Sequence, residues 1–247
     1  MKIAVMGTVY IKSDIAFKEA LKTLDSFKSS KHKVDIYLWE TTCPDDYRAV
    51  LRSYCKGYFY NDKNILARSW NRGIQFAFEN DYDYCYVINL DISLAKGCID
   101  KMIQFAEINE GMIYSPYCTN HNLEGVPDKT YLVKPAGYLD WNTYACFMVR
   151  KEFLQMNGFD ENFIPCYAED VDMGYRLQLL GLKHWCIREA EFEHYMAITI
   201  KNGGEDILAE KEKNAERYFE CKWGGRARQQ KYKTPFNNGG DVNYWVK

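Results

Sequence analysis

Carboxylates stand at two places where their surroundings suit them for chemistry. Asp91 follows the apolar run Val87–Ile88 in the stretch Asn-Leu-Asp-Ile-Ser (89–93), so its charge falls where a buried strand is expected to end. At a sheet edge, such a carboxylate faces ligand and suits a hard divalent cation, Mg²⁺ or Mn²⁺, that also binds phosphate. Asp91 is therefore a candidate metal ligand. The structural alternative is that it caps the turn before the next helix.

The second place is Glu169–Asp172, which has three carboxylates within four residues. A helix that begins near Glu169 would offset their repulsion, because the N-terminal end of its dipole favours negative charge. Asp172 and Arg176 are four residues apart and can pair on one face of that helix. Aromatic residues upstream predict a partly dry pocket, in which Asp170 could take a proton from a hydroxyl. An ordinary acidic helix start is the structural alternative.

One histidine belongs to the same set of candidates. His194 lies in Glu-Phe-Glu-His-Tyr (191–195), shortly after a strand-like run over 184–187. An imidazole near carboxylates can bind a metal or a phosphate. A lone histidine is more often structural, so the sequence leaves both interpretations open.

Strand-like and helix-like segments alternate along the chain and must position these residues. Short apolar runs predict strands over 3–9, 34–39, 84–88, 112–116, 144–149 and 184–187. Apolar residues at helical spacing predict helices over 15–27, 64–78, 97–108, 169–180 and 205–223, with a loop over 119–135. This alternation predicts an α/β fold with a mostly parallel sheet and helices on both faces. Right-handed crossovers would then align the carboxyl ends of the strands at one ligand-binding edge.

Composition narrows the class of protein. The chain has 247 residues, 47% hydrophobic and 27% charged, which is typical of a globular domain. Its formal net charge is −2, so the molecule as a whole does not attract nucleic acid or anionic membranes. The nine cysteines are an odd number without Cys-x-x-Cys spacing, which favours a reducing compartment. With no leader and no apolar run of about 20 residues, we expect a cytoplasmic protein made of one domain over 1–247.

The order of these motifs resembles the family 2 glycosyltransferases of the GT-A fold, in particular their rhamnosyltransferase-like branch. The resemblance covers about residues 1–195, and its second-half motifs are more specific than those near the N-terminus. The motifs are Gly7-Thr8-Val9-Tyr10, Asn64–Gly73, Asn89-Leu90-Asp91, the strand over 141–150, Gly158–Glu161, Glu169–Arg176 and His194.

The resemblance implies transfer of a sugar from a nucleotide-diphosphate sugar, such as a UDP-sugar, to an acceptor hydroxyl, with inversion. Asp170 would be the catalytic base, and Asp91 with His194 would hold Mn²⁺ or Mg²⁺. Glu169 and Trp141 would contact the acceptor or donor sugar. The remaining nucleotide-sugar-binding residues would be Thr8, Tyr10, Glu40, Asn64, Arg68, Asn71 and Asn89.

The chain departs from the family pattern in three respects. Asn89 stands where many members have Asp, which leaves one fewer anionic ligand for a metal. Trp39 and Glu40 occupy the stretch where a nucleoside-binding carboxylate is expected, so base recognition differs. The segment 196–247 lies outside the resemblance, and we expect it to form a C-terminal helix and a tail that acts as a lid or an acceptor arm.

The tail and the fold leave other functions open. Basic residues between 222 and 233 could close over a diphosphate, meet a polyanionic acceptor such as a modified nucleic acid, or be a solvated helix end. A nucleotidyltransferase would need a Gly-rich basic loop near the first strand, where Gly7 and Lys12 alone stand. A catalytically silent carbohydrate-binding protein of the GT-A type is the third alternative. Asn89 favours it and the intact Glu169-Asp170 pair opposes it.

Overall fold

A twisted sheet runs through the molecule in the computed structural model, which describes residues 1–120, 127–133, 144–195, 198–202, 207 and 210–246. Within those residues nine strands form one sheet in the order β3-β2-β1-β4-β8-β6-β9-β5, and β7 pairs with β9. The strands are β1 (Ile3–Tyr10), β2 (Val34–Thr42), β3 (Gly57–Tyr60), β4 (Tyr84–Ile88), β5 (Ile92–Leu94), β6 (Ile113–Cys118), β7 (Tyr131–Leu132), β8 (Cys146–Val149) and β9 (His184–His194).

Helices follow most of these strands. The α-helices are α1 (Asp14–Ser26), α2 (Asp45–Tyr54), α3 (Leu66–Glu79), α4 (Cys98–Ile108), α5 (Glu169–Leu179), α6 (Ile198–Lys201) and α8 (Arg217–Trp223). Short 3₁₀ turns cover Phe27–Ser29, Lys151–Met156 and Pro235–Asn237, and a π-helical segment, Lys211–Glu216, runs directly into α8. No described helix is long and apolar enough to cross a membrane.

The first four strands form the parallel part of the sheet, as the sequence predicts. β1 pairs in parallel with β2 and with β4, and β2 pairs in parallel with β3. β8 then runs antiparallel to both β4 and β6, while β9 is parallel to β6. Because β1, β2 and β4 point the same way, their carboxyl ends meet at one edge.

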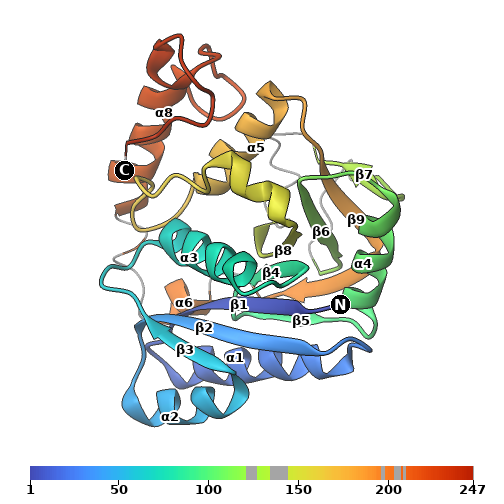
Figure 1. Cartoon of the computed structure of the whole chain (residues 1–247). Coiled ribbons are helices and arrows are strands. Elements are labelled where there is room, and N and C mark those ends of the chain that lie inside the picture. The colour runs from blue at the N-terminus through green and yellow to red at the C-terminus, as the bar shows by residue number, and fades with distance from the viewer. Residues whose placement is uncertain (121–126, 134–143, 196–197, 203–206, 208–209, 247) are drawn as a thin grey trace.

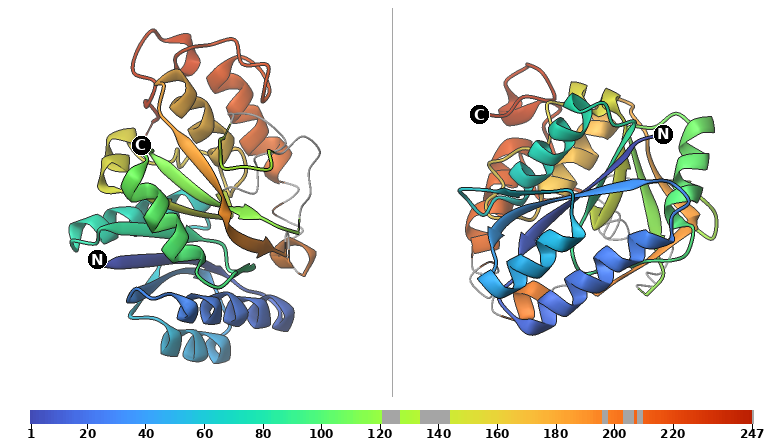
Figure 2. Two further views of the ribbon diagram at one scale, coloured as in Figure 1. Left: turned by 90° about the vertical axis from the view of Figure 1, so that its right-hand side faces the viewer. Right: turned by 60° about the horizontal axis from the view of Figure 1, so that its bottom comes forward.

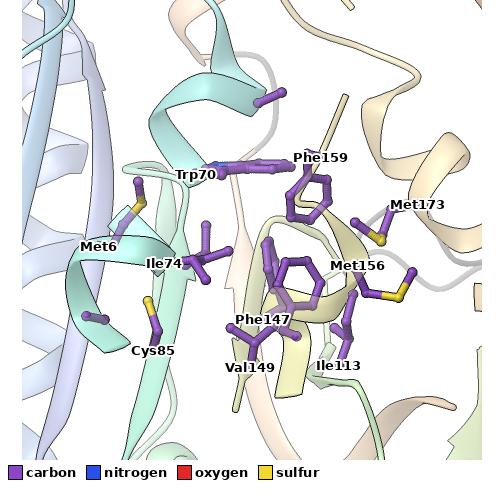
Figure 3. Packing of buried hydrophobic residues seen from close by; sticks show 14 of the residues in the cluster. Met6, Trp70, Ile74, Cys85, Ile113, Phe147, Val149, Met156, Phe159 and Met173 are labelled. Carbon is purple, nitrogen blue, oxygen red and sulfur yellow. The ribbon is translucent and has the colours of Figure 1, made fainter. Parts of the chain in front are cut away.

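Helices cover both faces of the parallel part. α1 and α2 lie on one side of β1–β3 and α3 lies on the other, and the views in Figures 1 and 2 agree on this. On the α3 side, Ile74 lies between Met6 and Phe147, and Trp70 lies beside Phe159 (Figure 3). Close packing there needs Gly73, because a Cβ at that position would come within 2.1 Å of Met6 Cγ.

Buried charges join α5 to α8. Lys222 Nζ lies 2.8 Å from an oxygen of Asp160 and 2.7 Å from an oxygen of Asp172. Asp172 also accepts from Arg176 Nε at 2.9 Å, so the predicted pair within α5 is confirmed. Trp223 Nε1 donates to Asp172 at 2.8 Å. Each charge is thus paired, which a charge away from water requires.

Some elements differ from those expected from the sequence. No helix was expected between the strands over 34–39 and 84–88 before residue 64, but α2 begins at Asp45, with Pro44 at the cap position and two acids in the first turn. That composition is also typical of a helix start. The last core strand, expected over 184–187, continues to His194 because β9 pairs first with β6 and then with β5.

Candidate functional site

The end of β1 lies beside the stretch that carries Asp91. Gly7 makes this approach close, because a Cβ there would lie 3.1 Å from Leu90 Cδ2. Thr8 follows, and its Oγ1 is buried without a hydrogen-bond partner among the described residues. Tyr10 ends the strand, with Lys12 Nζ 4.9 Å from the centre of its ring. An unpaired buried hydroxyl is costly, so Thr8 Oγ1 is positioned for a ligand or water.

Asp91 and His194 are brought together from distant parts of the chain. His194 Nε2 lies 3.2 Å from Asp91 Oδ1. The pairing of β5 with β9 places Ile92 opposite His194, and the Tyr195 N–H donates to the Asp91 carbonyl at 2.8 Å. Asn120 receives the His194 N–H at 3.0 Å and so fixes the backbone at that point. The resemblance-based pairing of these two residues therefore has a structural basis in the sheet.

This pair fits a divalent cation that is shared with a substrate. The described residues contain no group of three or more His, Cys, Asp or Glu side chains that could hold a metal alone. One carboxylate and one imidazole would leave most coordination positions to diphosphate oxygens and water, which is how Mg²⁺ and Mn²⁺ are usually held beside phosphates. Asn89 lies two residues before Asp91 and can add only a neutral amide oxygen.

Glu40 lies at the end of β2 and is almost fully buried, with 4% of its surface exposed. Arg48 of α2 donates to both of its carboxylate oxygens at 2.7 Å, and Tyr58 donates at 2.7 Å. Burial acts to raise the pKa of Glu40, but these hydrogen bonds outweigh it and hold that pKa below its usual range. Glu40 is thus an ionised group near the end of β2 that is already joined to α2 and β3.

The start of α3 connects the edge to the region before α5. Asn64 Oδ1 accepts from Thr41 Oγ1 of β2 at 3.3 Å. Two residues later, the Leu66 N–H donates to the Pro165 carbonyl at 2.9 Å. Asn64 therefore lies beside the end of β2, and Leu66, two residues later, contacts the segment that leads to Asp170.

Arg68 and Asn71 of α3 contact protein groups rather than open space. Arg68 Nε donates to Glu161 at 2.8 Å. Asn71 forms a reciprocal pair with the backbone of Phe159, with distances of 2.8 and 2.7 Å. Gly158 adopts φ +72° there, and a Cβ would lie 2.6 Å from Asn71 Oδ1. In the structure both residues hold the loop that leads toward α5.

The backbone that presents Glu169 and Asp170 is strained. Tyr167 and Ala168 adopt φ values of +78° and +66°, which non-glycine residues rarely adopt. Such strain persists only where surrounding structure maintains it, and it is concentrated at ligand-binding and catalytic sites. Asp170 Oδ1 accepts from the Val171 N–H at 2.8 Å in the first turn of α5. The helix dipole at this position favours its ionised form.

The two adjacent carboxyls differ in environment. Glu169 is 3% exposed, and its Oε2 has no hydrogen-bond partner within the described part of the chain. Burial, and then the charge of Asp170, raise the pKa of Glu169 well above its usual range. Asp170 is half-buried, and burial raises its pKa above its usual range even though backbone hydrogen bonds and the charge of Lys211 act in the opposite direction. One of the pair is therefore a neutral acid and the other is easier to ionise.

The structure brings Asp91 and His194 together and places Thr8, Tyr10, Glu40 and Asn64 at or beside the ends of β1 and β2, but it leaves other predicted groups apart from them. Trp141 lies outside the described residues. Lys222 and Trp223 of the basic segment are fully buried against α5, so they do not belong to a solvent-facing cationic surface. The predicted aromatic pocket is divided, because Phe159 packs with Trp70 of α3 whereas Phe163 packs with Phe219 of α8.

Two groups near the site were not predicted from the sequence. Arg48 belongs to α2, a helix that was not expected, and it pairs with Glu40. No local sequence pattern indicated that pair. Lys211 of the C-terminal segment lies over the Tyr167 ring, with its Nζ 4.6 Å from the ring centre. Its signal was present, since Lys211, Ala215, Phe219 and Trp223 follow one another at intervals of four residues.

No family model matches the chain. A stretch of 68 residues is 35% identical to the O-antigen biosynthesis protein RfbC of Myxococcus xanthus, and it makes up 25% of this chain and 5% of that protein. The chain therefore spans only a small part of that relative.

Solved structures resemble the whole architecture. GalNAc-T7 with UDP, GalNAc and Mn²⁺ gives a TM-score of 0.60 at 11% identity, covering 78% of this chain and 43% of that one. TarS of S. aureus gives 0.58 at 13% identity, covering 85% and 65%. The mannosyltransferase PcManGT from Pyrobaculum calidifontis, with GDP-Man and Mn²⁺, gives 0.57 at 10% identity, covering 78% and 56%. The chain spans less than two thirds of each, and it has the GT-A fold of nucleotide-sugar transferases.

Proposed function

We propose that this chain is an inverting glycosyltransferase that moves a sugar from a nucleotide-diphosphate sugar to an acceptor hydroxyl. The observation that carries the proposal is the Glu169-Asp170 pair, presented by strained backbone at the start of α5. The segment that leads to it accepts a hydrogen bond from Leu66 at the start of α3, and Asn64 nearby contacts Thr41 at the end of β2. A base and a diphosphate site on one edge are the two parts that such a transfer needs.

The donor would lie across the ends of β1, β2 and β4. Thr8, Tyr10 and Asn64 would line the nucleoside end, with Glu40 behind them, and Asn89 would lie beside the diphosphate. Asp91 and His194 would hold a divalent cation, which as a Lewis acid stabilises the charge on the leaving diphosphate. Solved structures of the same fold that contain Mn²⁺ with UDP or GDP-Man support a divalent cation beside a nucleotide donor.

Asp170 would act on the acceptor. Its carboxylate takes the hydroxyl proton as the acceptor oxygen bonds to the anomeric carbon and the bond from that carbon to the diphosphate oxygen breaks. A base on the face opposite the leaving group gives inversion. Glu169, neutral and with an unpaired buried oxygen, would hydrogen-bond a sugar hydroxyl, and Trp141 is the proposed second sugar contact. Arg68 and Asn71 would support the site from α3.

The test is the variant Asp170→Asn, which keeps the shape of the residue and removes the base. We expect release of nucleoside diphosphate from a panel of UDP- and GDP-sugars, with alkyl glycosides as acceptors, to fall by about a hundredfold or more. Binding of the nucleotide should be retained. Proton NMR of the product should show the anomer opposite to that of the donor.

Asp46→Asn is the matched control, because Asp46 is an exposed acid in the first turn of α2. It should leave the rate unchanged. A wild-type rate for Asp170→Asn would exclude Asp170 as the base. Tight donor binding without any turnover of the wild type would instead favour the silent carbohydrate-binding alternative.

A further inference from the structure

A groove runs along one side of α3, between this helix and the segment over 153–164 (Figure 1). Its volume is about 890 Å³, and the C-terminal segment borders it through Trp245 and Val246. Side chains of α3 and of the residue pair before it line the groove at helical spacing: Asn64, Arg68, Asn71, Gln75 and Glu79. From Arg68 to Glu79 this row extends about 17 Å, at 1.5 Å per residue. The groove therefore has the shape for a chain-like ligand.

Three amide side chains in the groove are each held by the protein at one end. The Asn64 oxygen accepts from β2 at 3.3 Å, the Gln75 nitrogen donates to Glu79 at 2.7 Å, and the Asn157 nitrogen donates to a carbonyl of the C-terminal segment at 3.1 Å. Within the described ranges of the chain, the other amide atom of each has no hydrogen-bond partner. Amides fixed in this way lose little side-chain freedom when a ligand binds.

The charges that line the groove balance one another. Lys63 and Arg68 contribute two cations, and Glu79 and Glu161 contribute two acids. Arg68 Nε lies 2.8 Å from Glu161, so this pair neutralises itself across the groove. Such a surface attracts neither a polyanion nor a polycation. A neutral ligand fits it best.

Apolar carbon lines the side opposite α3. Leu154, Ile164 and Val246 are 43%, 41% and 58% exposed. A pyranose ring presents C–H groups on its faces and hydroxyls at its edge. Aliphatic side chains beside oriented amides match both parts, as in ligand sites where a few polar groups fix orientation within an apolar lining.

We propose that this groove binds a neutral oligosaccharide. One end of the groove is at Asn64, beside β2, and Ile164 directly precedes Pro165, whose carbonyl accepts from the Leu66 N–H. This end thus adjoins the segment that leads to Asp170. The bound sugars would be the part of an acceptor that lies away from the reacting hydroxyl. That role rests on the proposed function, whereas oligosaccharide binding does not.

Saturation-transfer NMR of the full chain with cellohexaose, chitohexaose, maltohexaose and mannohexaose tests the binding. At least one should bind about tenfold more tightly than its monosaccharide, because it contacts more of the groove. Gln75→Ala and Leu154→Ala should each weaken this binding by about three- to tenfold, through loss of a hydrogen bond and of apolar contact.

Gln104→Ala and Leu132→Ala are the matched controls. Gln104 is an exposed glutamine of α4, and Leu132 of β7 is 43% exposed, as Leu154 is. Neither lines the groove, so both variants should bind as wild type. Binding of none of the four hexasaccharides, or equal weakening by groove and control substitutions, would overturn the proposal.

Two further probes test the chemistry of the ligand. Tighter binding of hexagalacturonate than of every neutral hexasaccharide would contradict the charge argument and overturn the proposal. A peptide copy of residues 239–246, the segment that borders the groove, is the second probe. If the protein bound this peptide and no hexasaccharide, the groove would be a peptide site instead.

A transferase assay separates this inference from the proposed function. Gln75→Ala and Leu154→Ala should raise the KM for a hexasaccharide acceptor and leave the KM for an alkyl monoglycoside unchanged. If hexasaccharides bind but no sugar is transferred, the proposed function fails and the groove remains a binding site. If sugar is transferred but no hexasaccharide binds, the inference about the groove fails alone.

Discussion

Burial of Glu169 lowers the free energy of unfolding of the protein when the pH is high enough to favour its ionised form. It is a buried acid with an unpaired oxygen, and its pKa is raised well above the usual range by burial and by Asp170. An acid whose pKa is higher in the folded than in the unfolded state binds more protons when folded. The contribution of Glu169 to the free energy of unfolding is therefore fully present below the pKa of an unfolded glutamate, about 4.3. This contribution is lost as the pH rises toward and through the pKa of Glu169 in the folded protein.

Glu169→Gln should remove this loss. We expect the variant and the wild type to have similar free energies of unfolding at pH 4. As the pH rises to 8, the variant should become the more stable of the two. Urea unfolding at a series of pH values measures this. Glu107→Gln, at an exposed position of α4, should give no such trend. A difference between Glu169→Gln and wild type that does not change with pH would contradict the argument.

For single residues, the sequence was a better guide to which side chains could be functional than to which other side chains they contact. The pairing of Asp172 with Arg176 followed from helical spacing and is confirmed, whereas the role of Asp170 as a base stays a prediction. Glu40 was selected for the nucleoside site, but its bonds to Arg48 and Tyr58 depend on how α2 and β3 pack. Side-chain contacts between elements that are far apart in sequence have no local signature.

Among the elements, α8 and α5 are coupled most strongly. Lys222 is fully buried between Asp160 and Asp172, and Tyr218 adds a hydrogen bond to Asp160 at 2.9 Å. A buried pair of this kind contributes little compared with an apolar replacement of the whole group, but removal of one partner leaves uncompensated charge.

Lys222→Met should therefore destabilise the fold by about 3 kcal/mol, because Asp160 and Asp172 lose their shared cation in a site without water. Chemical denaturation followed by circular dichroism measures the change. Lys213→Met removes a lysine from the exposed side of the same helical segment, and it should change stability by no more than about 0.5 kcal/mol. Equal effects of the two substitutions would mean that the buried network does not contribute to the stability of the fold.

The order of elements was largely predictable, whereas their ends were not. Apolar runs and helical spacing located β1, β2, β4, α1, α3 and α4 because each has a strong period of its own. α2 was missed since its first residues, Pro44 to Asp46, are equally typical of a turn. β5 was missed because its three residues become a strand only by pairing with β9.

Across the whole molecule, the fold places Thr8, Glu40 and Asp91 near the carboxyl ends of a largely parallel part of the sheet, where this architecture binds ligands. The sequence could predict that edge, because it follows from the alternation of strands and helices. The resemblance also implied that His194 joins Asp91 there, but the pairing of β5 with β9 that brings the two together has no local signal in the sequence.

A thermal-shift measurement tests whether the carboxyl ends of the strands bind a nucleotide and a metal together. UDP or GDP should raise the melting temperature in the presence of Mn²⁺, since a ligand that binds only the folded state stabilises it in proportion to its occupancy. The increase should become smaller without the metal and in Asp91→Asn. Asp46→Asn is the control and should behave as wild type. A response that is the same with and without Mn²⁺ would show that the nucleotide is bound independently of Asp91.

The packing of α8 against α5 also has a consequence for the order in which the protein folds during its synthesis. Residues 3–88 contain β1 to β4 with α1 to α3, so the parallel part of the sheet can form early as the chain leaves the ribosome. The packing around α5 is completed only when Lys222 and Trp223 have also emerged. The region around Asp170 would thus reach its final form later than the ends of β1, β2 and β4.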